Sequence, residues 1–318
     1  MGEERKSRLR ITSLVLGLVV LTCLAPLQAQ DSESSLHDRV TAEIQQGKLD
    51  AALADARLAV GQYPKSSELY QLLGVVLFKK GLNDDARTAF RRAIELDPSI
   101  PQNYYDVALV DLSEHRYDVA ASRLESHLRL DPTNAQAHLL LGRAYHNLNR
   151  TLPAIEQFKK ALALNPQLPL AHYHLGYAYQ SLGKLQDALN EFEAEITLNR
   201  EFYDAYWLAG NIELGNNRLD SAEKLFRKGI AVNPQAYTAH YGLAQILMAR
   251  KRFPEAEAEL KMALAASPDN VKIHYALART YQQMGKSADA QHEFQVCATL
   301  NARQQKERSG IAGAPAQP

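Results

Sequence analysis

Residues 67–100, SELYQLLGVVLFKKGLNDDARTAFRRAIELDPSI, decide the fold of this chain. Apolar and small side chains recur at helical spacing in two runs, 70–77 and 86–93, which predicts two amphipathic helices. The polar stretch 80–84 separates the runs. Pro98 ends the second run, because proline disfavours a helical residue before it. The stretch therefore predicts a helical hairpin.

This hairpin pattern recurs every 34 residues from residue 33 to residue 304, without insertion. The first four units, the sixth and the seventh each end in a turn that contains a proline. Arg200 takes the place of this proline in the fifth unit, and the eighth unit is the end of the array. We expect eight units, which begin at Glu33, Ser67, Pro101, Ala135, Pro169, Tyr203, Tyr237 and Val271.

Small residues occupy fixed places in the repeat, where they allow two helix backbones to approach closely. Position 8 is glycine or alanine in seven units, and position 24 is often phenylalanine. Position 20 is alanine in all eight units: Ala52, Ala86, Ala120, Ala154, Ala188, Ala222, Ala256 and Ala290.

With these positions, the chain resembles the tetratricopeptide repeat (TPR) family, which also favours leucine at position 7, tyrosine at 11, a small residue at 27 and proline at 32. The resemblance implies an all-α fold, a right-handed superhelical α-solenoid of antiparallel helical hairpins, whose concave surface is lined by the first helix of each unit. Departures from the family pattern are Arg39, Glu43, Asp111, His127, Glu195 and Glu213. They weaken packing expectations locally.

The N-terminus has the pattern of an export signal. Basic residues within 1–10 precede an apolar run, 11–24, and cleavage after Ala29 satisfies the requirement for a small residue at the cut. Residues 1–29 are therefore predicted to be a signal peptide. Two alternatives stay open: an uncleaved membrane anchor, although the run is short for a bilayer crossing, and lipid attachment at Cys23. All three place the chain outside the cytoplasm, in the periplasm or cell envelope.

Composition and length make some classes of function unexpected for this chain. The 36 basic and 36 acidic side chains balance, and the repeats lack a basic cluster, so we expect no nucleic-acid partner. The array leaves only residues 30–32 and 305–318 of the processed chain, too few for a catalytic domain. We find no catalytic, cofactor or metal motif and predict a non-enzyme without cofactor or metal. Cys297 is interpreted as a buried core residue, and 305–318 as a disordered tail.

Candidate binding residues follow from the resemblance, because positions 2, 5, 9, 12 and 13 of TPR units usually face the groove. Position 5 is aromatic in five units, which predicts a binding strip that other proteins or peptide segments would occupy. The alternative is that the rings fill the groove and contact one another. With the position 9 residues, the candidate set is Tyr105, Tyr173, Tyr177, Trp207, Asn211, Tyr241, Gln245, Tyr275 and Arg279.

Two further patterns bear on metal binding and on the binding of acidic groups. Histidine recurs at position 4, but equivalent positions of adjacent units are too far apart to share a metal ion, so a structural role is expected. No unit has the position 5 lysine of the family's carboxylate clamp, although Arg143, Lys272 and Arg279 could meet acidic groups. The sequence thus predicts an exported protein-interaction scaffold, with carbohydrate binding or self-association as alternatives and an undetermined oligomeric state.

Overall fold

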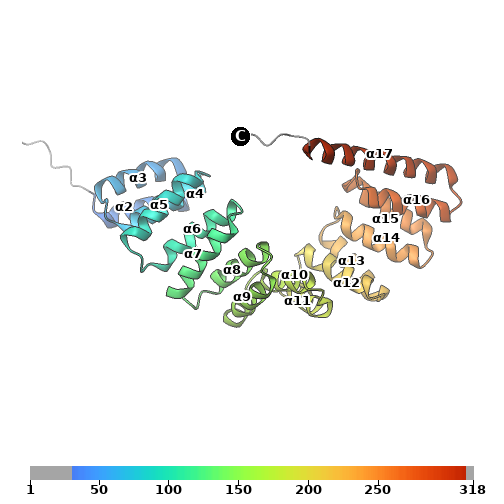
Figure 1. Ribbon diagram of the computed structural model, residues 1–318, viewed down its shortest axis with the longest axis horizontal. Coiled ribbons are helices and arrows are strands. Elements are labelled where there is room, and N and C mark those ends of the chain that lie inside the picture. Colours follow the sequence, from blue (N-terminus) through green and yellow to red (C-terminus); the bar gives the residue numbers. More distant parts are fainter. Residues whose placement is uncertain (1–30, 313–318) are drawn as a thin grey trace, which may run out of the picture. The chain divides into compact units, whose positions relative to one another are not determined.

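A computed structural model describes residues 31–312 of the chain, and this part consists of sixteen α-helices without a strand (Figure 1). The all-α helical repeat solenoid is confirmed. The helices are α2 (Glu33–Gln45), α3 (Leu49–Gln62), α4 (Ser67–Lys79), α5 (Asn83–Leu96), α6 (Pro101–Ser113), α7 (Tyr117–Leu130), α8 (Ala135–Asn147), α9 (Thr151–Leu164), α10 (Ala171–Ser181), α11 (Leu185–Leu198), α12 (Tyr203–Gly215), α13 (Leu219–Val232), α14 (Tyr237–Ala249), α15 (Phe253–Ala266), α16 (Val271–Gln283) and α17 (Ser287–Ala312).

The described residues divide into two compact units, of which the first ends at Val110 and the second begins at Asp111. In the first unit, α2 packs on α3 and α4 on α5; in the second, the same pairing joins α8 to α9 and every later pair up to α16 and α17. The boundary between the units lies within α6. In the second unit, successive hairpins also contact one another, as α11 contacts α12 and α13 contacts α14.

In four hairpins, a glycine of the first helix packs against a phenylalanine of the second. Phe226 is fully buried in α13, and a Cβ atom at Gly210 of α12 would lie 2.7 Å from its ring. A Cβ at Gly242 of the next hairpin would lie 2.4 Å from the same ring. Such distances are shorter than van der Waals contact, so these positions accept only glycine without repacking. The predicted close approach of the helix backbones is therefore present.

Seven of the eight predicted unit starts coincide with helix starts, and the fifth differs. Helix α10 begins at Ala171 instead of Pro169, after Leu170, whose φ of 65° places it in the left-handed region. The cause is Glu195, where the family has a small residue. Its buried carboxylate accepts hydrogen bonds from the backbone N–H groups of Leu170 at 3.3 Å and Tyr173 at 3.2 Å. The larger side chain thus displaces the start of α10 and caps it.

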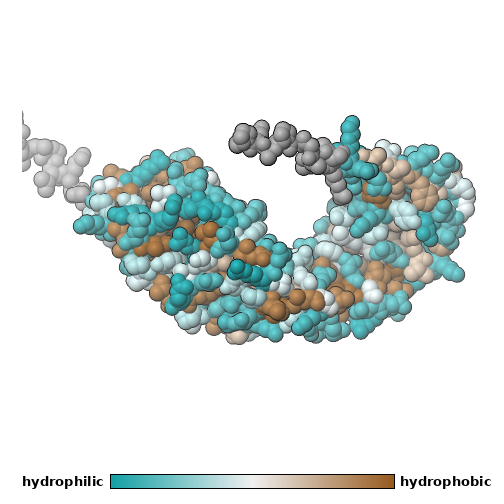
Figure 2. All heavy atoms as spheres, in the orientation of Figure 1, coloured by the Kyte–Doolittle hydropathy of each residue, from teal (hydrophilic) through white to brown (hydrophobic). Residues whose placement is uncertain are grey.

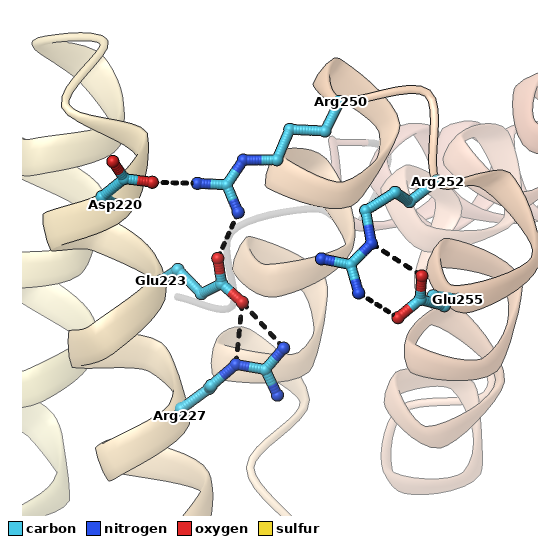
Figure 3. A network of polar contacts seen from close by, with 6 residues as sticks. All are labelled: Asp220, Glu223, Arg227, Arg250, Arg252 and Glu255. Carbon is cyan, nitrogen blue, oxygen red and sulfur yellow. Dashed lines mark hydrogen bonds and ion pairs between the residues drawn. The ribbon is translucent and has the colours of Figure 1, made fainter.

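Ion pairs connect successive hairpins of the second unit (Figure 3). Arg250, at the end of α14, contacts both Asp220 and Glu223 of α13. Glu223 also pairs with Arg227 on its own helix at 2.7 Å. Desolvation opposes the ionised form of Glu223, but the two arginines outweigh it and lower the pKa of this carboxyl. The network fixes α14 against α13.

The C-terminal end differs from its prediction. Helix α17 does not stop with the repeat at residue 304 but continues to Ala312, so the expectation of disorder is wrong for residues 305–312. Residues 302–307 are good helix formers, and Arg303 pairs with Glu307 one turn later at 3.1 Å. Residues 313–318 lie outside the described part.

The predicted signal peptide, its cleavage site and Cys23 lie outside the described residues. Within residues 31–312, no helix is both long and apolar enough to cross a membrane. Cys297 is 6% exposed, and its Sγ lies 3.6 Å from the carbonyl oxygen of Val271, in agreement with its interpretation as a core residue.

Candidate functional site

Four predicted groove residues line one open pocket of the second unit. Trp207 and Asn211 come from α12, Tyr241 and Gln245 from α14, and the pocket has a volume of about 660 Å³. The helices α12 and α14 contact each other directly, so positions 5 and 9 of two units form one surface. The two rings are partly buried on one side and reach the pocket on the other. We call this the Trp207 pocket.

The Trp207 pocket is held in place by its own helices. The indole Nε1 of Trp207 donates a hydrogen bond to Asp204, one turn earlier, at 3.2 Å. The opposite side of the indole packs against the apolar cluster around Phe226. Burial raises the pKa of Tyr241 above its ordinary value, so this ring carries a neutral hydroxyl at any physiological pH. The pocket therefore offers two oriented rings beside two amide side chains.

Sequence reasoning missed several residues that line the same pocket. They come from the first turn of α14, from the turn before α16 and from α17, and include Tyr237, Thr238, Asp269, Asn270 and Gln304. Lys272, which the sequence indicated as a possible contact for acidic groups, also lines the pocket. Asn270 precedes α16 and its side chain accepts a hydrogen bond from the backbone N–H of Lys272 at 3.1 Å. This N-cap pattern was visible in the sequence, whereas Gln304 had been placed at the limit of the last repeat.

The upstream candidates Tyr173 and Tyr177 are arranged differently. The ring of Tyr173 packs edge-on against Phe202 at 4.9 Å between centroids, and lies 6.3 Å from Tyr177 and 6.2 Å from Phe192. Tyr173 is thus partly buried among other aromatic rings, an arrangement similar to the alternative in which the rings contact one another. Tyr177 is 44% exposed.

The remaining candidates do not line the Trp207 pocket. Tyr275 is 51% exposed, and its ring packs edge-on against Phe294 at 5.8 Å. Arg279 is exposed one turn further along α16. Tyr105 belongs to the first unit, where its side chain is partly buried on α6. Of the predicted groove residues, Trp207, Asn211, Tyr241 and Gln245 thus share one pocket, and the binding strip over the whole set stays a prediction.

A hollow of similar volume, about 640 Å³, lies in the first unit and is lined by Arg57, Tyr70, Arg92 and residues of α5. Arg92 is already paired with Glu95 at 3.0 Å. None of its lining residues has a groove position of the repeat, so we place the candidate site at the Trp207 pocket. Figure 2 shows that hydrophilic residues lie among the exposed hydrophobic ones on the visible face of both units.

The position 4 histidines are part of the hairpin frame. In each, Nδ1 contacts a side chain of the second helix: His138 contacts Gln157 at 2.8 Å, and His172, His240 and His274 contact Glu191, Glu259 and Glu293 at 2.6 Å. In three of them Nε2 faces the carbonyl oxygen of the proline that ends the preceding unit, at 2.7–3.2 Å. The rings thus tie each hairpin to the turn before it, which accounts for their recurrence.

Comparison with protein families agrees with this frame. A tetratricopeptide repeat model matches residues 37–101, 173–230 and 208–271, and two further models, a TPR repeat and a tetratricopeptide repeat, match 153–183 and 259–292. The chain belongs to the tetratricopeptide repeat family. A comparison with curated proteins gives no match.

Solved TPR structures are similar in fold. MamA is 27% identical, with a TM-score of 0.50 over 51% of this chain and 95% of that chain. YrrB, described as a TPR protein with an unusual peptide-binding site, is 23% identical, with a TM-score of 0.52 over 62% and 97%. PilF of Pseudomonas aeruginosa is 17% identical, with a TM-score of 0.59 over 67% and 97%. Family and fold indicate a protein-interaction scaffold, in a family whose members are generally not catalysts.

Proposed function

We propose that this protein is an exported scaffold that binds an extended segment of a partner protein in the groove of its second unit. One observation carries the proposal: Trp207 and Tyr241 meet beside Asn211 and Gln245 in an open pocket, at the repeat positions that line TPR grooves. YrrB, with the same fold, is described as having a peptide-binding site.

The residue types suit a polypeptide. Rigid aromatic rings supply contact area with little loss of side-chain entropy, and amide side chains can both donate to and accept from a peptide backbone. Helices in contact lie about 8–10 Å apart, and an extended chain advances about 3.3 Å per residue. Rings on α12 and α14 therefore match side chains about three residues apart in the bound segment.

Site-specific photo-crosslinking tests the proposal. A photoreactive amino acid at position 211 or 245 should capture a defined polypeptide in native cell envelopes, and a Trp207→Ala background should reduce that capture. The same probe at Leu152, which is 67% exposed on α9, is the matched control. Retention on cell-wall polysaccharide without a polypeptide adduct would favour carbohydrate binding. Adducts with a second copy of this chain would favour self-association.

The location is a separate part of the proposal and rests on residues 1–29 alone. Mass spectrometry of the protein from its native cells should find a mature N-terminus at Gln30. A lipid-modified Cys23 at the N-terminus would indicate membrane attachment by lipid, and an intact N-terminus in the membrane fraction would indicate an anchor. An intact chain in the cytoplasm would contradict export.

A further inference from the structure

A second, smaller hollow of the second unit brings three basic side chains together. It has a volume of about 200 Å³ and lies upstream of the Trp207 pocket. Arg143 and His146 come from α8 and His174 from α10, with Tyr173 and Tyr177 beside them. Among the described residues that line this hollow, none is an aspartate or a glutamate. We call it the Arg143 pocket.

Arg143 is exposed, and its guanidinium makes no ion pair or hydrogen bond with any described residue. Asn147 contacts Arg143 only through the backbone, because its side-chain amide donates to the Arg143 carbonyl oxygen at 2.9 Å. The arginines of the α13 to α15 region, such as Arg250, are paired with carboxylates instead. The Arg143 pocket thus holds a permanent positive charge without a counter-charge in its lining.

The protonation of His146 follows from its hydrogen bonds. The hydroxyl of Ser181 donates its single hydrogen to the backbone carbonyl of Tyr177 at 3.0 Å. The contact of 3.2 Å between this hydroxyl and Nε2 of His146 therefore requires Nε2 to be the donor. Nδ1 has no hydrogen bond with a described residue. Protonation would make Nδ1 a second donor, available to an anion.

The third basic group, His174, is held as a neutral wall. Its ring stacks on Phe158 with the centroids 5.8 Å apart and meets Tyr173 edge-on at 5.2 Å. Burial, with smaller contributions from the charges of Arg143 and His146, lowers the pKa of His174 to about 3. His174 therefore stays neutral at physiological pH and limits the space beside Arg143.

We propose that Arg143 and His146 form a binding site for a carboxylate group, supplied by an aspartate or glutamate side chain of the bound partner segment. The identity of the carboxylate's source rests on the proposed function, whereas the anion site itself does not. Arginine presents paired donors that match the two oxygens of a carboxylate. Both lie on the first helix of a unit, on the same side as the candidate groove positions.

The site should respond to pH. His146 faces the ring of Tyr177 at 5.5 Å and the hydroxyl of Ser181 on α10, and Arg143 and His174 are the other charged or titratable groups of the pocket. Burial lowers the pKa of His146 below its ordinary value. A bound anion favours the protonated imidazole and raises that pKa, so anion affinity should increase as the pH falls from 8 to 5.5.

NMR of the imidazole groups tests this with free ions, without a partner protein. Acetate supplies the carboxylate, sulfate keeps its charge between pH 5.5 and 8, and chloride at matched ionic strength is the blank. We expect acetate and sulfate to shift the His146 signals saturably and to raise its pKa. Arg143→Gln should weaken both ions by about tenfold or more, the loss expected for a charge-assisted hydrogen bond. Arg200→Gln, at an exposed arginine outside the pocket, should leave both affinities unchanged.

Shifts that follow ionic strength alone, or that are equal in the two variants, would overturn the anion site. Saturable binding of sulfate without acetate would overturn its assignment to a carboxylate. Failure of crosslinking at positions 211 and 245 would contradict the proposed function and leave this result intact, so the two failures are distinguishable.

Discussion

Two stretches of the same groove carry an aromatic ring at repeat position 5, but the two rings have different surroundings. At position 5 of the fifth unit, Phe202 packs edge-on against the ring of Tyr173, which borders only the small Arg143 pocket. At position 5 of the sixth unit, the ring of Trp207 borders open space. The residue that differs is position 34 of each unit, which is Phe202 in the fifth and Ala236 in the sixth.

The backbone at these two residues is nearly the same. Phe202 precedes α12 with φ −84° and ψ 89°, and Ala236 precedes α14 with φ −76° and ψ 96°. A side chain at either place therefore leaves the backbone in a similar direction. Phe202 thus places a ring against Tyr173, whereas Ala236 has no ring to place against Trp207, and we infer that this side chain influences how open the position 5 ring is.

The largest effect is expected from a substitution in the core of the hairpins that carry both stretches. Phe226→Ala should lower the free energy of unfolding of the second unit by about 3–5 kcal/mol, because a fully buried ring leaves a cavity against Gly210 and Gly242. Chemical denaturation followed by circular dichroism measures this. Phe294→Ala, at the same repeat position in the last hairpin, should cost less because that ring is only partly buried. Equal losses would show that the Phe226 seam has no special weight.

The next largest effect is expected for partner binding when the ring of Trp207 is removed. Trp207→Ala should weaken partner binding by about 2 kcal/mol or more, on the order of 30-fold, if the indole is a binding hot spot. Isothermal titration calorimetry with the crosslinked segment, made as a synthetic peptide, measures the change. Tyr173→Ala should have a smaller effect, because that ring already packs against Phe202. A larger loss for Tyr173→Ala would reverse the comparison.

Exchanging the two turn residues tests the comparison itself. Ala236→Phe should place a ring over Trp207 and weaken binding by about tenfold, about 1.4 kcal/mol. Phe202→Ala should expose Tyr173 without weakening binding at the Trp207 pocket. Crystal structures of both variants would show whether the rings move as expected. Unchanged affinity in folded Ala236→Phe protein would remove the role assigned to position 34.

The smallest expected effect is a pH dependence of stability that comes from the histidine–glutamate pairs of particular hairpins. The hydrogen bond that Nδ1 of His240 donates to the carboxylate of Glu259 raises the pKa of His240 above its unfolded value, and the bond from His172 to Glu191 does the same for His172. This stabilisation is fully present below about pH 6.5, the ordinary histidine pKa, and is lost as the pH rises through the raised value. The contribution of these two pairs to the melting temperature should therefore fall between pH 6 and pH 8, against the rise expected from His174, whose pKa is lowered by burial.

Glu259→Gln supplies the control for this pH effect, because it recreates the neutral pairing that His138 already makes with Gln157. The difference in melting temperature between the unchanged protein and the variant should therefore shrink as the pH rises from 6 to 8. An identical pH dependence in the variant and the unchanged protein would exclude the His240–Glu259 pair as its source.

The sequence predicted the helical hairpins and their packing because the same pattern occurs in eight units. Alanine at position 20 and glycine against phenylalanine follow from close packing, and helix starts follow from the period. The late start of α10 could not be predicted, because it depends on how far the carboxylate of Glu195 reaches. The surroundings of Tyr173 and Trp207 depend on contacts between different units, which a pattern of single positions does not contain.

The most direct measurement of the central claim uses Trp207, which is the only tryptophan of the chain, so its fluorescence reports on the pocket without a label. On addition of the segment identified by crosslinking, the account predicts a saturable blue shift of the emission as the indole loses contact with water. It also predicts that Ala236→Phe weakens this response by about the tenfold given above. A segment that binds with full affinity while the emission of Trp207 stays unchanged would contradict the account.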